Sequence, residues 1–174
     1  MSHLIAVDDQ VRRVGRSSVN MPAEWRVSLR KAERRAAFSL LLPHHPSANQ
    51  GNMTDAYLFP QGAEVALLFP MPAGTSPTDP TSPPYIEILE EPRTRGAPLK
   101  DYKQDIARTP DVGKSICSVD QRTPALCVKA RSPSDSRGNN AAYLRFVTKG
   151  VQIQITGGDD LQRLLDIAKT LSRA

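Results

Sequence analysis

Hydrophobic and polar residues alternate most regularly near the end of the chain. The segment Val151–Thr156 has valine or isoleucine at every second position and glutamine or threonine between them. Residues 142–147 alternate in the same way, and residues 148–150 can form the turn that joins the two segments. A period of two gives a strand one buried face and one solvated face. The pattern therefore predicts a hairpin in an antiparallel sheet with one wet side.

An amphipathic helix is predicted directly after this hairpin. Gly157 and Gly158 break the second strand, and Asp159 is the expected N-cap, with Gln162 three residues later as its capping-box partner. A stripe of apolar residues then recurs at helical spacing: Leu161, Leu164, Leu165, Ala168 and Leu171. Such a stripe must pack on an apolar surface, so we expect the helix to lie on the buried face of the hairpin.

Three further strands are predicted in the middle of the chain. Residues 55–60 and 63–69 read as a hairpin with a tight turn at Gln61-Gly62, and residues 85–90 read as the next strand of a meander. Residues 71–84 are rich in proline, serine and threonine and cannot form regular structure. We expect a mobile loop there, with a docking peptide in polyproline conformation as the alternative.

The first helix is expected between residues 21 and 42. Ser28 is a suitable N-cap, and three apolar residues follow at helical spacing: Leu29, Ala32 and Ala36. The opposite face of this helix is basic and contains Arg30, Arg34 and Arg35. That face could bind phosphate groups, although a charged face in contact with solvent is the simpler interpretation. Residues 38–43 leave the helix and are expected to enter the core.

The predicted elements define an α+β fold in a single domain. We expect a curved antiparallel sheet of about six to seven strands, with the N-terminal helix and the C-terminal amphipathic helix packed on it. Residues 21–174 form this domain, and residues 1–20 form a flexible leader without sustained periodicity. Residues 99–106 are expected to form no more than a short helical turn.

Two cysteines lie in a second predicted hairpin. Cys117 and Cys127 belong to the short apolar segments 115–119 and 125–130, and a hairpin that closes near Arg122 would place them opposite each other. A cross-strand disulfide, which implies an oxidising compartment, and a pair of buried thiols in neighbouring strands both fit this pattern. Two cysteines without further ligands do not make a structural zinc site.

The charge balance changes the picture only slightly. The net charge is +5 and the isoelectric point is about 9.5, which permits loose attraction to nucleic acid or to an anionic membrane surface. This balance is common in ordinary soluble domains, so we do not expect nucleic acid as a specific partner. No run of about eighteen apolar residues is present, and no signal peptide is visible. We therefore expect either a cytoplasmic protein or a chain attached to a membrane through a segment that it lacks.

Residues for catalysis are not found in a recognisable arrangement. The three histidines, His3, His44 and His45, all lie in the first part of the chain, and neither a nucleophile elbow nor a phosphate-binding glycine loop occurs. We predict that the protein is not an enzyme and uses no cofactor and no metal. The wet sheet face, with Tyr143, Gln152 and Gln154, is the expected binding surface.

The order of the segments resembles a bacterial domain family of unknown function. A helix followed by residues 37–43 (AFSLLLP) looks like the opening of this family, and residues 57–59 with 65–69 are similar to its early strand pair. Residues 143–155 and 161–171 look like its last hairpin and terminal helix, so the resemblance covers residues 25–172. The family occurs in extracytoplasmic parts of anti-sigma-factor-like proteins and lipoproteins. It has no established functional residues to carry over.

Three functions are therefore considered. The leading hypothesis is a non-catalytic extracytoplasmic binding or sensory domain of a membrane-anchored regulator or lipoprotein. Its partner would be a protein or an apolar ligand at the cell envelope, bound against the sheet. The alternative is a basic cytoplasmic adaptor that binds nucleic acid or anionic lipid through the arginine face of the first helix. The third hypothesis is a small enzyme of unknown type.

Overall fold

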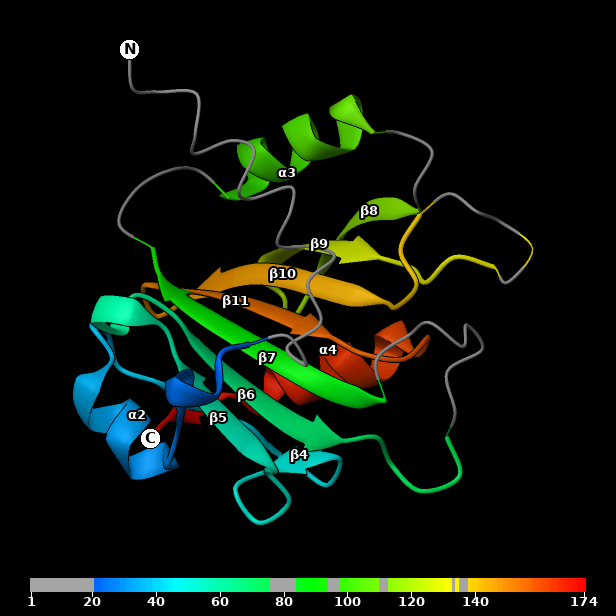
Figure 1. The fold of residues 1–174 in the computed structure, drawn as a ribbon. Helices are drawn as coiled ribbons and strands as arrows, with labels where there is room; N and C mark the ends of the chain where they lie inside the picture. The colour runs from blue at the N-terminus through cyan, green and yellow to red at the C-terminus, as the bar shows by residue number, and fades with distance from the viewer. Residues whose placement is uncertain (1–20, 76–83, 94–97, 110–112, 133, 135–137) are drawn as a thin grey trace.

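A large antiparallel sheet forms the centre of the molecule (Figure 1). The computed structural model describes residues 21–75, 84–93, 98–109, 113–132, 134 and 138–174. The sheet has eight strands, in the spatial order β1-β5-β6-β7-β11-β10-β9-β8. In this order their bounds are Arg26–Val27, Asp55–Leu58, Val65–Pro70, Tyr85–Pro92, Val151–Thr156, Tyr143–Thr148, Pro124–Val128 and Lys114–Ser118.

Helices and short strand pairs complete the described fold. The helices are α2 (Leu29–Arg35), α3 (Pro98–Arg108) and α4 (Leu161–Lys169), with single 3-10 turns at η2 (Ala23–Trp25) and η3 (Pro60–Gly62). Two short strands, β2 (Leu41–Leu42) and β12 (Ser172–Arg173), pair with each other, as do β3 (His44–His45) and β4 (Ala48–Asn49).

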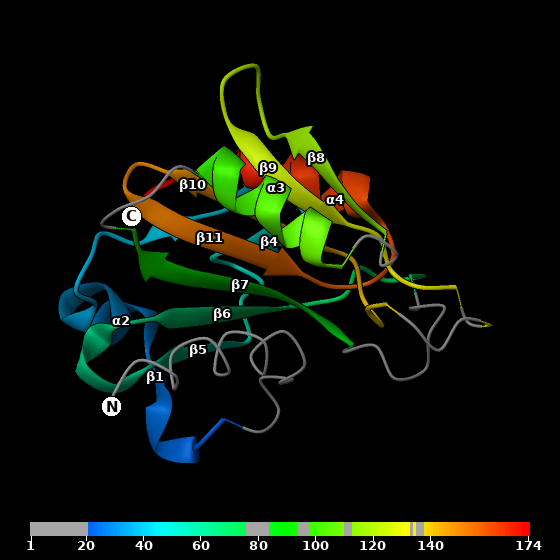
Figure 2. The same cartoon turned by 90° about the horizontal axis from the view of Figure 1, so that it is seen from above.

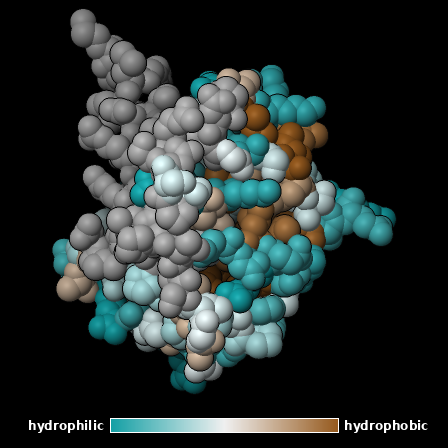
Figure 3. Space-filling view, turned by 90° about the vertical axis from the view of Figure 1, so that its right-hand side faces the viewer, coloured by the Kyte–Doolittle hydropathy of each residue, from teal (hydrophilic) through white to brown (hydrophobic). Residues whose placement is uncertain are grey.

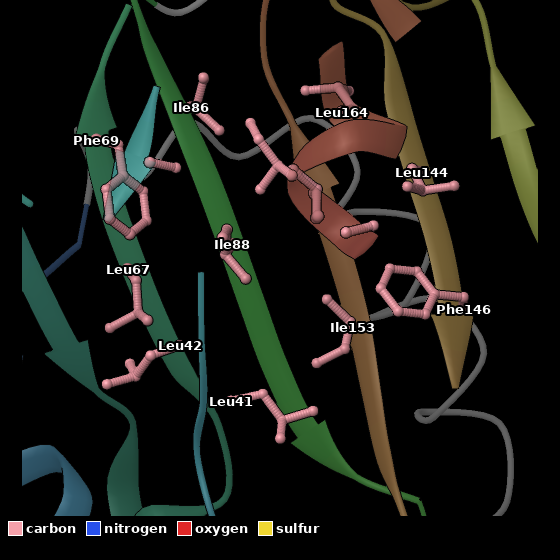
Figure 4. Close-up of a cluster of buried hydrophobic side chains, with 14 of the residues drawn as sticks. Leu41, Leu42, Leu67, Phe69, Ile86, Ile88, Leu144, Phe146, Ile153 and Leu164 are labelled. Atoms are coloured by element: carbon pink, nitrogen blue, oxygen red, sulfur yellow. The ribbon is translucent and has the colours of Figure 1, made fainter. Parts of the chain in front are cut away.

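The main core lies between the inner face of the sheet and the layer formed by α4 and β2. Strand β7 contributes Ile86 and Ile88 to this face, and Ile153 of β11 lies beside them, all three without exposed surface. Leu164 of α4 and Leu41 of β2 close the core from the other side (Figure 4). The predicted alternation and the predicted position of the last helix are therefore confirmed.

The fold class is confirmed at the level of an antiparallel sheet with helices, and its details differ. The sheet has eight strands rather than six to seven, and the described chain contains three helices. Residues 98–108 form the full helix α3, which covers the outer face at the β8–β9 end of the sheet (Figure 2). Helix α2 packs beside β5 near one edge of the sheet.

The connection between β5 and β6 contains the predicted tight turn at Gln61-Gly62. Both residues have positive φ angles, +62° and +67°, and Ala63 N–H donates to the Pro60 carbonyl oxygen at 3.3 Å. Strand β5 ends at Leu58 and β6 begins at Val65, with η3 between them. Gly62 has a φ of +67° and lies against the end of α2, where Ala37 N–H donates to the Gly62 carbonyl oxygen over 2.9 Å. The turn prediction is therefore confirmed, and the same turn also contacts the end of the first helix.

The two predicted helix caps have different outcomes. Ser28 accepts a hydrogen bond from Lys31 N–H at 3.3 Å and caps α2 as expected. Asp160, and not Asp159, caps α4 by accepting from Arg163 N–H at 3.0 Å. The Gly158 carbonyl oxygen still accepts from Ala142 N–H at 2.7 Å, so the chain leaves the sheet later and the helix starts one residue further on.

Two other predictions concern residues that the structure does not describe. The expected leader at residues 1–20 lies outside the described ranges, and so does most of the proline-rich segment, from residue 76 to residue 83. The hairpin turn before β11 is described and matches its prediction. Lys149 and Gly150 both have positive φ angles, +49° and +78°, as a two-residue turn between twisted strands requires.

Candidate functional site

The outer face of the sheet contains the polar side chains that the sequence marked for binding. Gln152 and Gln154 of β11 point to this face and are half-buried. The strand register places Gln152 between Glu91 and Val147, and Gln154 between Leu89 and Arg145. The face is therefore mixed in character, with polar, charged and apolar residues side by side on neighbouring strands.

Gln152 takes part in a chain of polar contacts that joins the sheet to α3. Its side-chain oxygen accepts a hydrogen bond from Arg93 Nη1 at 2.6 Å, and its amide nitrogen donates to the Glu91 carboxylate. Arg93 also forms an ion pair with Asp101 on α3. Lys114 on β8 forms a second such pair with Asp105, at 2.8 Å. These contacts position α3, so Gln152 has a structural task and is not simply solvated.

Tyr143 is on the predicted face but is not available for binding. Helix α3 places Tyr102 on a small second core with Leu126, Val128 and Tyr143, and only 3% of Tyr143 remains exposed. The expectation of a wet surface at Tyr143 is therefore wrong. It failed because a helix with few apolar residues, which the sequence did not predict at full length, covers this end of the sheet.

Two phenol groups and one guanidinium group lie together under α3. The Arg145 guanidinium lies 6.0 Å from the centre of the Tyr143 ring. Burial raises the pKa of both Tyr102 and Tyr143 above the ordinary value of 10.0, and the charge of Arg145 opposes this shift in both cases. The Tyr102 hydroxyl is buried and has no hydrogen-bond partner. Both tyrosines are therefore neutral packing residues at physiological pH.

The two cysteines form a disulfide between the last two strands of the sheet. Cys117 of β8 and Cys127 of β9 are joined, and their Cα atoms are 5.9 Å apart. They are diagonal neighbours and not directly opposite, because Cys117 faces Ala125 and Cys127 faces Ser115. The predicted hairpin is confirmed, and of the two alternatives for the cysteines the disulfide is the one present. The directly opposed register is wrong by two residues.

The basic face of the first helix lies apart from this surface. Arg30, Arg34 and Arg35 are all exposed on α2, and Arg34 Nε donates to the Arg30 carbonyl oxygen at 3.2 Å. Helix α2 packs beside β5, whereas α3 packs on β8 and β9. The structure therefore does not bring the arginine face and the glutamine face together, and they are two separate candidate surfaces.

A buried carboxyl group was missed by the sequence reasoning. Glu90 of β7 has no exposed surface, and its neighbours on the adjacent strands are Val65 and Ile153. One oxygen accepts from Leu41 N–H at 2.9 Å, and the other oxygen has no hydrogen-bond partner. Burial raises the pKa of Glu90 from 4.5 to about 8, against the smaller opposing effect of that bond. The strand alternation already assigned Glu90 to the buried face, which was the available signal.

Metal ligands do not come together in the part of the chain that the structure describes. No group of three or more His, Cys, Asp or Glu side chains could hold an ion among these residues. His44 and His45 form the short strand β3, where His44 Nε2 is 2.8 Å from Ser172 Oγ. None of the described helices is both long and apolar enough to cross a membrane.

Taken together, the contacts of the described polar groups hold elements of the fold in place. The residues of raised pKa are enclosed in packed cores, and the outer-face polar groups are engaged with one another. Comparison with known proteins adds nothing to this picture, because no protein family, curated protein or solved structure matches the chain.

Proposed function

We propose that this chain is a non-catalytic binding domain that works outside the cytoplasm, as part of a membrane-anchored regulator or lipoprotein. Its partner is a protein or an apolar ligand at the cell envelope. The partner binds the outer face of the central strands, where Gln154, Leu89 and Tyr57 are half-exposed. This area lies beside the part of the outer face that α3 covers.

The Cys117–Cys127 disulfide is the observation that carries this proposal. Disulfides persist in oxidising compartments and are rare in the cytosol, where thiols are kept reduced. This disulfide joins the edge strand β8 to its neighbour, and Cys117 is only partly buried there. A reductant would reach such a bond more readily than one in the main core, so the disulfide supports a location in an oxidising compartment.

The position of the titratable groups supports a binding role rather than catalysis. Acids and bases that act in catalysis converge on a cleft where a substrate can reach them. Glu90 instead lies between β2 and the sheet, and Tyr102 lies between α3 and the sheet. Their pKa values are raised because they are packed away from solvent.

The redox state of the cysteines in the native compartment tests the proposal. We expect both thiols to react with an alkylating reagent only after reduction, as measured by intact mass on protein isolated from its own cells. A sample that is unfolded but not reduced before alkylation controls for steric protection of Cys127, which is 1% exposed. Free alkylation of both cysteines in unfolded but unreduced protein would remove the main support for the extracytoplasmic location.

The exposed arginines of α2 favour a second candidate function, a basic adaptor for anionic lipid or nucleic acid. Arg30, Arg34 and Arg35 occupy one short helix and are all exposed, and the whole chain has a net charge of +5. Binding of this kind is electrostatic and weakens steeply as salt is added.

Vesicle binding tests this second candidate. If it is correct, replacing Arg30, Arg34 and Arg35 with glutamine should reduce binding to vesicles that contain phosphatidylserine by about a hundredfold, at about 1 kcal/mol per charge. Replacement of Lys100, Lys103 and Arg108 on α3 removes the same charge from another exposed helix face and serves as the matched control. Equal losses in the two variants, or no binding at low salt, would exclude a specific role for α2.

A further inference from the structure

Strand β8 presents a row of backbone groups at the edge of the sheet. Val119 N–H donates to the Thr123 carbonyl oxygen at 3.0 Å. Lys129 N–H donates to the Gly113 carbonyl oxygen at 3.2 Å. Because these bonds alternate along an antiparallel pair, the odd-numbered residues of β8 bond to β9. The N–H and C=O groups of Lys114, Ile116 and Ser118 therefore point away from β9. No described strand pairs with that side.

This edge lacks the features that usually prevent strand pairing. Proteins protect edge strands with proline, with a β-bulge or with an outward lysine. Strand β8 contains no proline, and its register with β9 is unbroken from Lys114 to Ser118. The Lys114 side chain is turned toward α3, where it bonds to Asp105 at 2.8 Å and to Thr109 at 2.6 Å. The disulfide also keeps the strand extended by fixing it to β9.

An exposed isoleucine lies at the centre of the open strand. Ile116 is the third of the five residues of β8 and is 40% exposed. Among the described residues, it and Leu99 of α3 are the large hydrophobic side chains that remain exposed. Hydrophobic surface bordered by polar residues is visible on the side of the molecule shown in Figure 3. A partner strand along β8 would cover Ile116.

We propose that β8 pairs with β8 of a second copy of this chain, antiparallel and about a two-fold axis at Ile116. The two Ile116 side chains then face each other, and Lys114 of each copy lies opposite Ser118 of the other. About six backbone hydrogen bonds form, two for each such pair. The two eight-stranded sheets join into one continuous sheet.

The strand fits a second copy because it is complementary to itself. A two-fold interface requires that one surface match its own image. Ile116 at the centre satisfies this with an apolar pair, and Lys114, the one charged residue of β8, meets an uncharged serine. In each copy α3 lies over β8 and β9 (Figure 2). A two-fold axis perpendicular to the sheet keeps both α3 helices on the face that Ile116 occupies, so that they would flank the junction from the two sides.

A charge-exchange experiment on the full chain tests this proposal. We expect the wild-type protein to show a concentration-dependent monomer–dimer equilibrium in sedimentation velocity. Ile116→Lys and Ile116→Glu should each weaken the dimer at least tenfold, because like charges then face each other across the axis. An equimolar mixture of the two variants should restore a dimer, since each copy then presents the opposite charge.

Ser115→Lys provides the matched control. Ser115 is exposed, its side chain lies on the other face of β8, and in the proposed register it faces an uncharged cysteine. The same added charge should therefore leave the dimer within about threefold of wild type. Circular dichroism checks that all variants remain folded. A wild-type protein that stays monomeric up to about 1 mM, or a mixture of Ile116 variants that does not associate, would overturn the proposal.

Discussion

The stability of the protein is expected to fall as the pH rises from 4.5 to 8, and replacing Glu90 with glutamine should abolish most of this fall. The folded pKa of Glu90 is about 8 and its ordinary value is 4.5, so the folded state holds the proton more tightly than the unfolded state. Unfolding then releases a proton in this window, and stability declines by about 1.4 kcal/mol per pH unit. The total change is about 5 kcal/mol.

Urea unfolding at a series of pH values measures this effect. Full stability is present below pH 4.5, where Glu90 is protonated in both states, and the loss levels off above pH 8. The other groups with shifted pKa values act outside this window. The pKa values of Asp120 and Asp166 are lowered from 3.8, and those of Tyr102 and Tyr143 are raised from 10.0.

Glu91→Gln is the control for this experiment, because it removes a carboxylate from the neighbouring residue on the outer face. It should leave the pH dependence unchanged. Glu90→Gln keeps an oxygen that can accept from Leu41 N–H, so the fold should be retained. If stability rises or stays level between pH 4.5 and 8 in the wild type, Glu90 is not a buried neutral acid.

Replacing Gly62 with alanine is expected to destabilise the protein by about 3 kcal/mol or more. Its φ of +67° disfavours any residue with a Cβ, which costs about 1 kcal/mol. A Cβ atom there would also lie 2.2 Å from the Arg35 carbonyl oxygen and 3.0 Å from Ala37 N. Both atoms belong to the backbone at the end of α2, so the clash can be relieved only by moving the helix.

Gly150→Ala separates these two causes. Gly150 has a φ of +78°, but a Cβ atom at this position would meet no atom within 4 Å. We therefore expect a loss of about 1 kcal/mol from the conformational strain alone. The difference between the two variants, measured as midpoints of urea unfolding at equal m-values, gives the cost of displacing α2. Equal losses would show that α2 is not held by this contact.

The parts of the fold that were predicted from the sequence show their hydrophobic pattern within a single continuous segment. The hairpin of β10 and β11 and the helix α4 follow from strict periods of two and of about four residues along one continuous stretch. The meander of β5, β6 and β7 and the hairpin of the cysteines have the same property. In each case a single strand or helix contains the pattern that determines which face it buries.

The parts that could not be predicted depend on contacts between distant segments. Helix α3 buries Tyr102 and half-buries Ile106, and its position depends on Arg93 and Lys114, which lie outside the helix. Nothing within residues 98–108 shows that these partners exist. The same holds for the candidate surface. The alternation within its own strand predicts that Tyr143 is solvent-exposed, but α3, which comes from another segment, covers it.

The order of the strands determines how the sheet can form during synthesis on the ribosome. Strands β5, β6 and β7 lie in chain order, whereas β8 to β11 lie in reverse order and return to β7. Strands β7 and β11 pair at the middle of the sheet. Among the neighbouring strands of this sheet, they are the pair most widely separated along the chain. Since the amino-terminal part emerges first, the free edge of β7 remains open until β11 has been translated. The nascent chain is thus most exposed to aggregation along β7, the strand that ends in the centre of the folded sheet.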